Sequence, residues 1–258
     1  MRGPDRELLV DAAHAAGRIA RRHFKANPKV WDKGGGQGPV TEADLEIDRM
    51  LRHELLAARP DHGWLSEESE DNPDRLRARR VFIVDPIDGT RSFVAGRETF
   101  AHSLAIAEAG KVVVGVVHLP LLGLTFEASM GAGAACNGKA LPKLRDARLQ
   151  DARILAARPQ MAPERWPGGV PPVERHFRSS LAYRLCLVAG GEFDGMVTLR
   201  DAWEWDIAAG DLICREAGAV VTSRDGAALT FNTDPPTCPG ILAASPSVHA
   251  GLMAHMLP

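Results

Sequence analysis

Apolar residues recur at helical spacing near the start of the chain. Between residues 5 and 25 one face of a predicted helix carries Leu8, Leu9, Ala12, Ala16, Ile19, Ala20 and Phe24. A second helix is expected to begin after Thr41, a suitable N-cap residue, and to run to about Ala58. Its apolar face would consist of Ala43, Ile47, Met50, Leu51 and Leu55.

The next region has the pattern of strands. We expect strands at residues 81–84 and 125–128, and two more within 102–118, joined by a tight turn near Ala109 and Gly110. The arginine-rich run 75–80 is expected to be a solvated lead into the first of these strands. The first half of the chain therefore predicts two helices against a largely antiparallel sheet.

The second half alternates between helix and strand, which indicates an α/β arrangement. The expected elements are strands near 154–157, 196–199, Val220 and Ile241, helices at 180–189 and 207–217, and a proline-rich loop at 159–172. The fold class is thus α/β overall, α+β in the first half and α/β in the second. We expect the halves 1–130 and 131–258 to form one compact unit.

Composition excludes several classes of protein. The net charge of −2 gives no basic surface for a nucleic-acid polymer. Charged residues 5–7 stand where a signal peptide needs an apolar stretch, and the most apolar region, 112–126, is broken by His118 and Pro120, so neither a signal peptide nor a membrane span is expected. The four cysteines are far apart and form no C-x-x-C pair, so neither a zinc site nor a disulfide framework is expected. These features are typical of a cytoplasmic protein with free thiols.

Two aspartates stand at the end of the 81–84 strand, in the sequence VDPIDGT. Such pairs are common in turns, and on their own Asp85 and Asp88 fit a turn as well as a metal site. Neighbouring carboxylates raise each other's pKa values, so that one of them takes up a proton and becomes neutral, unless a bound cation keeps them ionised. Oxygen donors with no histidine or cysteine beside them favour Mg²⁺, with Mn²⁺ as a substitute. Gly89 permits a tight turn, and a helix starting at Thr90 could receive a phosphate.

Other acidic residues have both a functional and a structural interpretation. Glu67 and Glu68 suit a metal site or a solvated loop, and Asp206 suits a metal site or the first turn of a helix. For Asp44 the structural interpretation is a capping box with Thr41, whose sole role would be to start the helix. The glycine-rich segment that follows Lys33 lacks the G-K-[ST] ending of a nucleotide loop, and we expect it to be flexible.

The segments PVTEAD, SEES, VDPIDGT and WDIAAGDLICREAGA, spread over residues 39–219, resemble the inositol monophosphatase superfamily of Mg²⁺-dependent, lithium-sensitive phosphomonoesterases. The resemblance implies a layered αβαβα sandwich, a homodimer and attack by water without a covalent enzyme intermediate. Haloacid-dehalogenase phosphatases also carry D-G-T after an aspartate, but their aspartates are two positions apart, whereas Asp85 and Asp88 are three apart.

The resemblance also implies metal ligands. Glu67, Asp85 and the backbone carbonyl of Ile87 would hold one Mg²⁺ ion, and Asp85, Asp88 and Asp206 a second. Glu67 would also contact a third, weaker ion.

Catalytic and phosphate-binding residues follow by the same resemblance. Thr90 and Asp44 match the pair that orients and deprotonates water, and Gly89 and Thr90 offer backbone N–H groups to the phosphate, beside Asp206. Lys33 matches a lysine on the family's mobile loop.

The substrate is less well defined by the sequence. Inositol-specific members carry a glutamate where this chain has Leu199, although Arg200 or Asp201 could supply a polar contact. The segment 178–191 resembles bacterial 3'(2'),5'-bisphosphate nucleotidases, which favours a bisphosphate nucleotide as the small phosphate monoester.

Ser179, Ser180 and Arg184 are the candidate contacts within that segment. A serine N-cap followed by an exposed helical arginine would explain the last two equally well. Inositol monophosphate, histidinol phosphate (through the shared DGTR) and a regulatory binding module remain alternatives.

Overall fold

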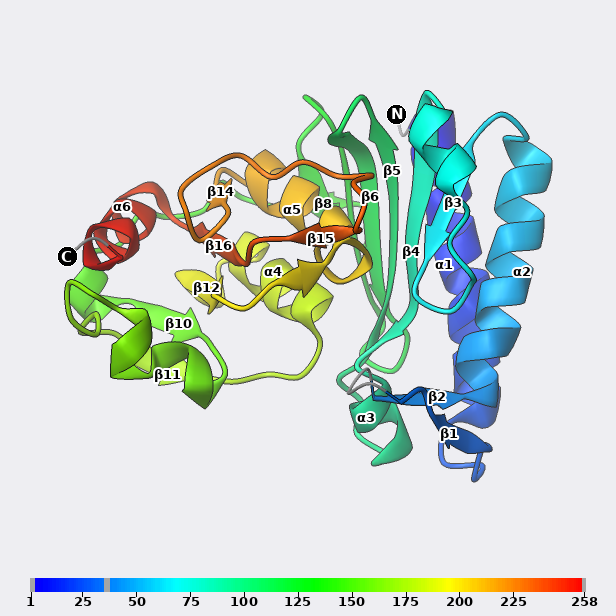
Figure 1. Cartoon of the computed structure of the whole chain (residues 1–258), viewed down its shortest axis with the longest axis horizontal. Coiled ribbons are helices and arrows are strands. Elements are labelled where there is room, and N and C mark those ends of the chain that lie inside the picture. Colours follow the sequence, from blue (N-terminus) through cyan, green and yellow to red (C-terminus); the bar gives the residue numbers. More distant parts are fainter. Residues whose placement is uncertain (1–2, 35–37, 257–258) are drawn as a thin grey trace.

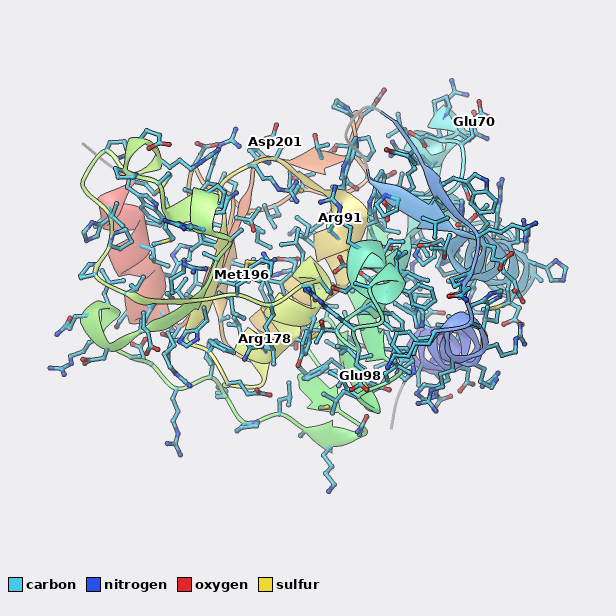
Figure 2. All side chains as sticks on the ribbon, turned by 90° about the horizontal axis from the view of Figure 1, so that it is seen from below. Glu70, Arg91, Glu98, Arg178, Met196 and Asp201 are labelled. Atoms are coloured by element: carbon cyan, nitrogen blue, oxygen red, sulfur yellow. The ribbon has the colours of Figure 1, made fainter. Side chains whose placement is uncertain are left out.

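The structure, a computed structural model, describes residues 3–34 and 38–256. Figure 1 shows a layered αβαβα arrangement, which confirms the expected sandwich. The layers are α1 (Pro4–His23) with α2 (Glu42–Ala58), a large sheet, α4 (Leu181–Ala189) with α5 (Glu204–Glu216), a smaller sheet, and α6 (Pro246–His255). Figure 2, turned by 90°, shows the same succession from α6 at one side to α1 and α2 at the other.

The large sheet has seven strands in sequence order. They are β3 (Gly63–Ser66), β4 (Arg80–Asp88), β5 (Ala101–Glu108), β6 (Lys111–Leu119), β7 (Leu124–Ser129), β8 (Ala134–Cys136) and β9 (Lys139–Ala140). Only β3 and β4 are parallel, so the expected largely antiparallel sheet is confirmed. Ala109 and Gly110 form the expected turn, with φ values of 50° and 77°.

The smaller sheet has five strands in the order β11-β10-β12-β16-β14. Their bounds are β10 (Arg153–Leu155), β11 (Glu174–His176), β12 (Gly195–Thr198), β14 (Val220–Thr222) and β16 (Ile241–Ala244). Two short antiparallel pairs complete the described strands: β1 (Val30–Asp32) with β2 (Pro39–Thr41), and β13 (Ala202–Trp203) with β15 (Thr237–Cys238). The proline-rich loop contains the 3-10 turns Arg158–Met161 and Pro163–Arg165, and further 3-10 turns lie at Pro73–Arg77 and Leu149–Asp151.

The buried apolar residues that the structure describes form three clusters, and the largest reaches from the seven-stranded sheet across α4 and α5 to the smaller sheet. Within this cluster α5 packs closely against both β6 and α4, because a glycine stands at each of the two contacts. A Cβ added to Gly115 on β6 would lie 2.8 Å from the Ala209 carbonyl oxygen, and one on Gly210 would lie 2.4 Å from Leu185. This tight packing brings the first turn of α5 against the sheet.

The arginine-rich run differs from its expected solvated state at one position. Arg75 is 2% exposed, and it pairs with Asp71 and donates to the Asn232 side chain and the Thr233 carbonyl. The guanidinium is buried because these groups supply enough acceptors to replace water. It therefore ties the loop before β4 to the C-terminal part of the chain.

Cys136, Cys186, Cys214 and Cys238 are all free thiols, so no disulfide joins them. Across residues 3–34 and 38–256, every helix is too short or too polar to cross a bilayer. The large sheet continues through β9 at Lys139–Ala140, past residue 130 where the two halves are expected to meet. The division at that residue stays a prediction.

Candidate active site

A bulge at the end of β4 creates the centre of the site. Asp85 pairs with Ser103 of β5 and Asp88 pairs with Ala101, with a register shift between them. Two residues of β4 therefore stand opposite the single residue His102, an arrangement that bends a strand and re-aims its side chains. The strand thus continues four residues beyond the predicted end at Val84 and carries both carboxylates.

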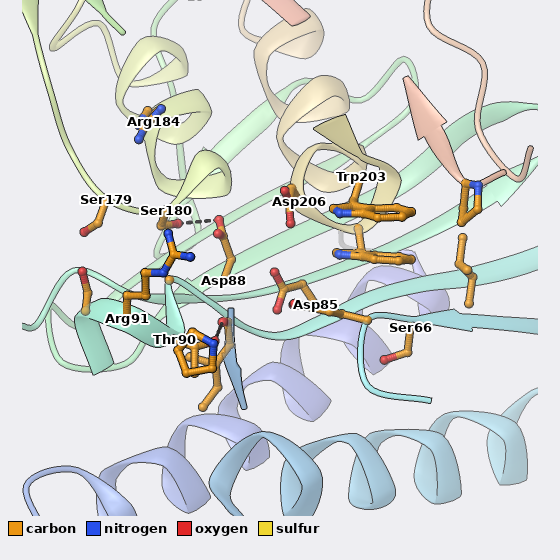
Figure 3. Close-up of a pocket in the computed structure, with 18 of the residues that line it drawn as sticks. Ser66, Asp85, Asp88, Thr90, Arg91, Ser179, Ser180, Arg184, Trp203 and Asp206 are labelled. Atoms are coloured by element: carbon orange, nitrogen blue, oxygen red, sulfur yellow. Dashed lines mark hydrogen bonds between the residues drawn. The ribbon is translucent and has the colours of Figure 1, made fainter. Parts of the chain in front are cut away.

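Asp206 joins these two carboxylates from the first turn of α5. Carboxylate oxygens of Asp85, Asp88 and Asp206 all lie within 4.8 Å of one another. Figure 3 shows the three side chains around one shared space. The Ser103 hydroxyl donates to the Trp205 carbonyl at 2.9 Å, which fixes the start of α5 against β5.

The cluster is electrostatically unfavourable by itself. Burial is the main cause that raises the pKa values of Asp85 and Asp206 well above the ordinary value, and the other carboxylates raise them further. Burial also raises the pKa of Asp88, to about 6. One oxygen of Asp85, Oδ1, is buried and has no hydrogen-bond partner among the residues that the structure describes. An unpaired buried oxygen among carboxylates fits a hard divalent cation, because the cation would satisfy the oxygen and keep the group ionised.

The second helix layer holds Asp88 from its other side. Asp88 Oδ2 accepts hydrogen bonds from the Ser180 hydroxyl at 2.6 Å and from the Ala182 amide at 2.7 Å. Ser180 also caps α4, since its hydroxyl oxygen accepts from the Tyr183 amide at 3.0 Å. The backbone of Ser180 is in a conformation that is strained for a non-glycine residue, with φ 67°. The N-cap interpretation is confirmed, and the same hydroxyl also reaches the carboxylate cluster.

Lys33 bridges the two glutamates that follow β3. Its ammonium donates to Glu67 Oε1 and to Glu68 Oε1, each at 2.7 Å. Only 3% of the Glu68 side chain is exposed, so the solvated-loop interpretation is wrong for Glu68. Burial first, and then the charge of Glu67, raises the pKa of Glu68 to about 8. Residues 35–37, where flexibility is expected, lie outside the described residues.

Asp44 belongs to both a helix cap and the site. Its Oδ2 accepts from the Thr41 amide at 2.9 Å, and the Thr41 hydroxyl caps the Ala43 and Asp44 amides, so the capping box of α2 is confirmed. On the other side, Thr90 Oγ1 lies 3.2 Å from Asp44 Oδ1 and 3.0 Å from the Ile87 carbonyl oxygen. Burial raises the pKa of Asp44 to about 6.

Gly89 connects β4 to the short helix α3 (Thr90–Val94). Its φ of 102° suits glycine, and a side chain there would meet the backbone of Phe100 at 3.5 Å. The expected helix start at Thr90 is confirmed. Gly89 and Thr90 both line the cavity described next.

The carboxylates open into a cavity of about 900 Å³. Three features share its lining: the acidic cluster, a set of arginines and a set of aromatic rings. Residues of these kinds are Glu67, Asp71, Asp85, Asp88, Asp206, Arg91, Arg97, Arg184, Arg200, Phe177, Trp203 and Trp205. Figure 3 shows Arg91 and Trp203 on opposite sides of the carboxylates.

Two cavity residues have unusual surroundings. Arg184 is 7% exposed, which overturns its interpretation as an exposed helical arginine, and its guanidinium lies 4.6 Å from the centre of the Phe177 ring. Trp203 stacks on Trp205 with ring centres 4.8 Å apart and an interplanar angle of 8°. Sequence reasoning did not find the aromatic pair, although the letters WEW directly before Asp206 could have indicated it.

Three consecutive residues, 199–201, are considered for contacts with the substrate's hydroxyl groups, and they have different surroundings. Leu199 is 3% exposed and packs in the cluster beneath α6, away from the cavity. Arg200 lines the cavity. Asp201 instead pairs with Arg224 at 2.6 Å and is absent from the cavity lining, as far as residues 3–34 and 38–256 show. Ser179 lines the cavity too, and its hydroxyl is bonded to the Thr99 carbonyl.

Known proteins of one kind match this chain along nearly all of its length. The model of the "Inositol monophosphatase family" matches residues 3–257. An inositol-1-monophosphatase of Rhizobium meliloti is 36% identical over 231 residues, covering 85% of each chain. The 3'(2'),5'-bisphosphate nucleotidase CysQ of Aggregatibacter actinomycetemcomitans is 30% identical over 232 residues, covering 87% of this chain and 86% of the relative.

Solved structures agree with the sequence comparison. The crystal structure of the extragenic suppressor protein suhB from Bartonella henselae superimposes with a TM-score of 0.84 at 31% identity, covering 97% of each chain. The protein therefore belongs to the inositol monophosphatase family.

Proposed function

We propose that the protein is a Mg²⁺-dependent phosphatase that hydrolyses a small phosphate monoester. The observation that carries the proposal is the convergence of three carboxylates, with an unpaired Asp85 oxygen, beside a cavity lined with arginines. A cavity with both signs of charge suits an anionic ester and its cations. Membership of a metal-dependent phosphatase family supports the same conclusion.

The residues present can be assigned to two ions. Glu67, Asp85 and the Ile87 carbonyl would hold one, and Asp85, Asp88 and Asp206 the other, while Glu67 would also contact a weaker third ion. Bound Mg²⁺ would acidify a water molecule and stabilise the attacking and leaving oxygens of an in-line displacement. Because the carboxylates come from both halves of the chain, we propose that residues 1–130 and 131–258 act as one unit.

Thr90 and Asp44 form the proposed proton path. Asp44 accepts the Thr90 hydroxyl hydrogen, and the lone pairs of that hydroxyl then face the cavity and can orient water. A base whose pKa is raised to about 6 is still ionised at neutral pH and accepts a proton more readily than an ordinary aspartate. The Gly89 and Thr90 amides are assigned to the phosphate, and Lys33 to the glutamates it already bridges.

A 3'(2'),5'-bisphosphate nucleotide fits the cavity best. Arg184 is buried and, within the described part of the chain, forms no ion pair with a carboxylate, so it can receive a second phosphate. The indole of Trp203 offers a surface on which a nucleobase can stack. Leu199 lies in the core and offers nothing to the hydroxyl groups of inositol.

Inositol monophosphate is the second candidate, because the Rhizobium meliloti relative is an inositol-1-monophosphatase and Arg200 lines the cavity. Histidinol phosphate is the third, since a histidinol-phosphatase of Chlorobaculum parvum is 35% identical over about half of each chain.

Phosphate release tests the proposal. The purified protein is incubated with Mg²⁺ and a panel of nucleotide bisphosphates, inositol monophosphates, sugar phosphates and histidinol phosphate, with Asp206→Asn as the inactive control. Release that depends on Mg²⁺, fastest with a bisphosphate nucleotide, supports the proposal. No release from any ester would favour a regulatory binding module instead.

Three further features are proposed: a cytoplasmic location, a homodimer and inhibition by lithium. All four cysteines are free thiols, which suits a location in the reducing cytoplasm. A homodimer and inhibition by lithium follow from the resemblance to the superfamily. Gel filtration with light scattering tests the dimer, and phosphate release in the presence of LiCl tests the inhibition.

A further inference from the structure

The bulge in β4 leaves backbone groups that the sheet cannot pair. Between Asp85 and Asp88, the residues Pro86 and Ile87 have no Cα partner on β5. Both residues are buried, and a buried carbonyl without a donor costs free energy. In the proposed function the Ile87 carbonyl oxygen holds a metal ion and the Thr90 hydroxyl donates to Asp44, which leaves the Pro86 carbonyl to be satisfied by another donor.

His102 provides the donor for that carbonyl. It is the β5 residue opposite the bulge, it is 0% exposed, and its Nδ1 lies 2.5 Å from the Pro86 carbonyl oxygen. A carbonyl oxygen only accepts, so the hydrogen of a neutral imidazole must sit on Nδ1. Burial lowers the pKa of His102 to about 4, which keeps the ring neutral at physiological pH.

The rings around His102 restrict its orientation. The Phe100 ring lies edge-on with its centre 6.2 Å away, and the His118 ring centre is at 6.0 Å. A side chain held in one orientation can in turn hold the peptide to which it is bonded. The peptide between Pro86 and Ile87 is planar, so fixing its carbonyl fixes the whole unit.

We propose that His102 is a positioning residue that anchors the Pro86 carbonyl and thereby sets the directions of the Asp85 carboxylate and the Ile87 carbonyl. The inference rests on the proposed function, in which both of these groups hold metal. Ser103, the residue after His102, points to the other face of β5, and its hydroxyl binds the Trp205 carbonyl just before Asp206. Successive residues of one strand thus hold the two segments that carry the carboxylates, because side chains alternate between the faces of a sheet.

Three variants separate positioning from general packing. His102→Leu removes the donor, and His102→Asn restores one, because the Asn amide nitrogen can occupy the place of Nδ1. His249→Leu is the matched control: His249 is also a buried histidine with a side-chain hydrogen bond, but it lies on α6 and is bonded to Thr222. If His102→Leu does not fold, His102→Met replaces it, since methionine lacks a donor and adapts to irregular space.

The variants are compared in two measurements that do not depend on turnover. Mn²⁺ affinity is measured by calorimetric titration, and hydrogen exchange of peptides covering residues 84–90 is measured in metal-free protein. We expect His102→Leu to weaken Mn²⁺ binding by about ten-fold or more and to speed exchange in that segment. His102→Asn should recover most of both, and His249→Leu should change neither, even if its melting temperature falls.

Three results would overturn the inference: unchanged Mn²⁺ affinity in His102→Leu, an equal loss in His249→Leu, or no recovery in His102→Asn. Failure of the proposed function has a different signature. If the wild-type protein binds Mn²⁺ but releases phosphate from no ester, the proposed function fails, and the Mn²⁺ titrations still decide the role of His102. A wild-type protein that binds no Mn²⁺ overturns both.

Discussion

Replacing Asp88 with asparagine should stabilise the metal-free protein while abolishing its response to Mg²⁺. The pKa of Asp88 is raised from 3.8 to about 6, mainly by burial. A raised folded-state pKa gives stability that is complete below the unfolded pKa and is lost as the pH rises through about 6. At pH 8 the ionised carboxylate therefore costs about 3 kcal/mol, from about two pKa units at 1.36 kcal/mol each.

Asparagine removes this cost because it carries no charge. Its carbonyl oxygen can keep the hydrogen bonds from Ser180 and Ala182, and its amide can donate to the neighbouring carboxylates. A gain of about 3 kcal/mol corresponds to a rise in Tm of roughly 6–12 °C for a chain of this size. Removing one shared carboxylate should also lower kcat by at least about 100-fold, because the proposed second ion loses a ligand.

Thermal unfolding at pH 8, in chelator and in Mg²⁺, measures both effects. Wild-type protein should melt higher with Mg²⁺, whereas Asp88→Asn should melt higher than wild type in chelator and gain little from Mg²⁺. The advantage in chelator should shrink toward pH 4. Asp211→Asn is the control, because Asp211 is a buried carboxylate that pairs with Arg215 outside the cavity lining. The reasoning is refuted if Asp88→Asn is less stable than wild type in chelator or keeps the full Mg²⁺ response.

Four further outcomes are expected. Thr90→Val should lower kcat by about 100-fold or more with little change in Tm, since it removes the hydroxyl between Asp44 and the cavity; normal kcat in steady-state assays would exclude the proton path. The ionisation of Asp44 should make kcat/KM rise with pH through an inflection near 6, measured from pH 5 to 8, and a flat profile would contradict its role as base. Trp203→Ala should raise KM for a bisphosphate nucleotide by about ten-fold and leave KM for sugar phosphates unchanged. An unchanged KM for the nucleotide would mean that no base stacks on Trp203. Arg75→Ala should cost about 3 kcal/mol in denaturant titrations, because it leaves buried acceptors unpaired, while kcat of the folded protein stays unchanged; a loss below 1 kcal/mol would mean that the buried network contributes little.

The long elements were predictable because their burial is periodic. α1 and α2 each bury one face, and β5 and β6 are apolar runs separated by a tight turn, so the pattern of apolar residues matches the fold directly. β13 and β15 are only two residues long and β11 only three, too short to show a period. β4 passes through Asp-Pro-Ile-Asp, residues that normally end a strand, because the bulge and its side-chain donors replace the missing sheet contacts.

The site was predictable in its composition more than in its contacts. The motifs placed Asp85, Asp88 and Asp206 together, and the structure brings them together. The sequence could not show that Arg184 is buried or that His102 faces the bulge, because both depend on which elements pack against them. Ser180 illustrates the overlap of roles: it caps α4 as the structural interpretation predicts, it also donates to Asp88, which the sequence did not indicate, and its contact with a substrate stays a prediction.

The central claim is that these carboxylates hold shared divalent cations, and crystals grown with Mn²⁺ test it most directly. Anomalous scattering locates manganese independently of any assumption about the site. We predict at least one strong peak within about 2.5 Å of carboxylate oxygens from Asp85, Asp88 and Asp206. A fully occupied Mn²⁺ ion elsewhere on the protein, with no peak between these three residues, would contradict the account.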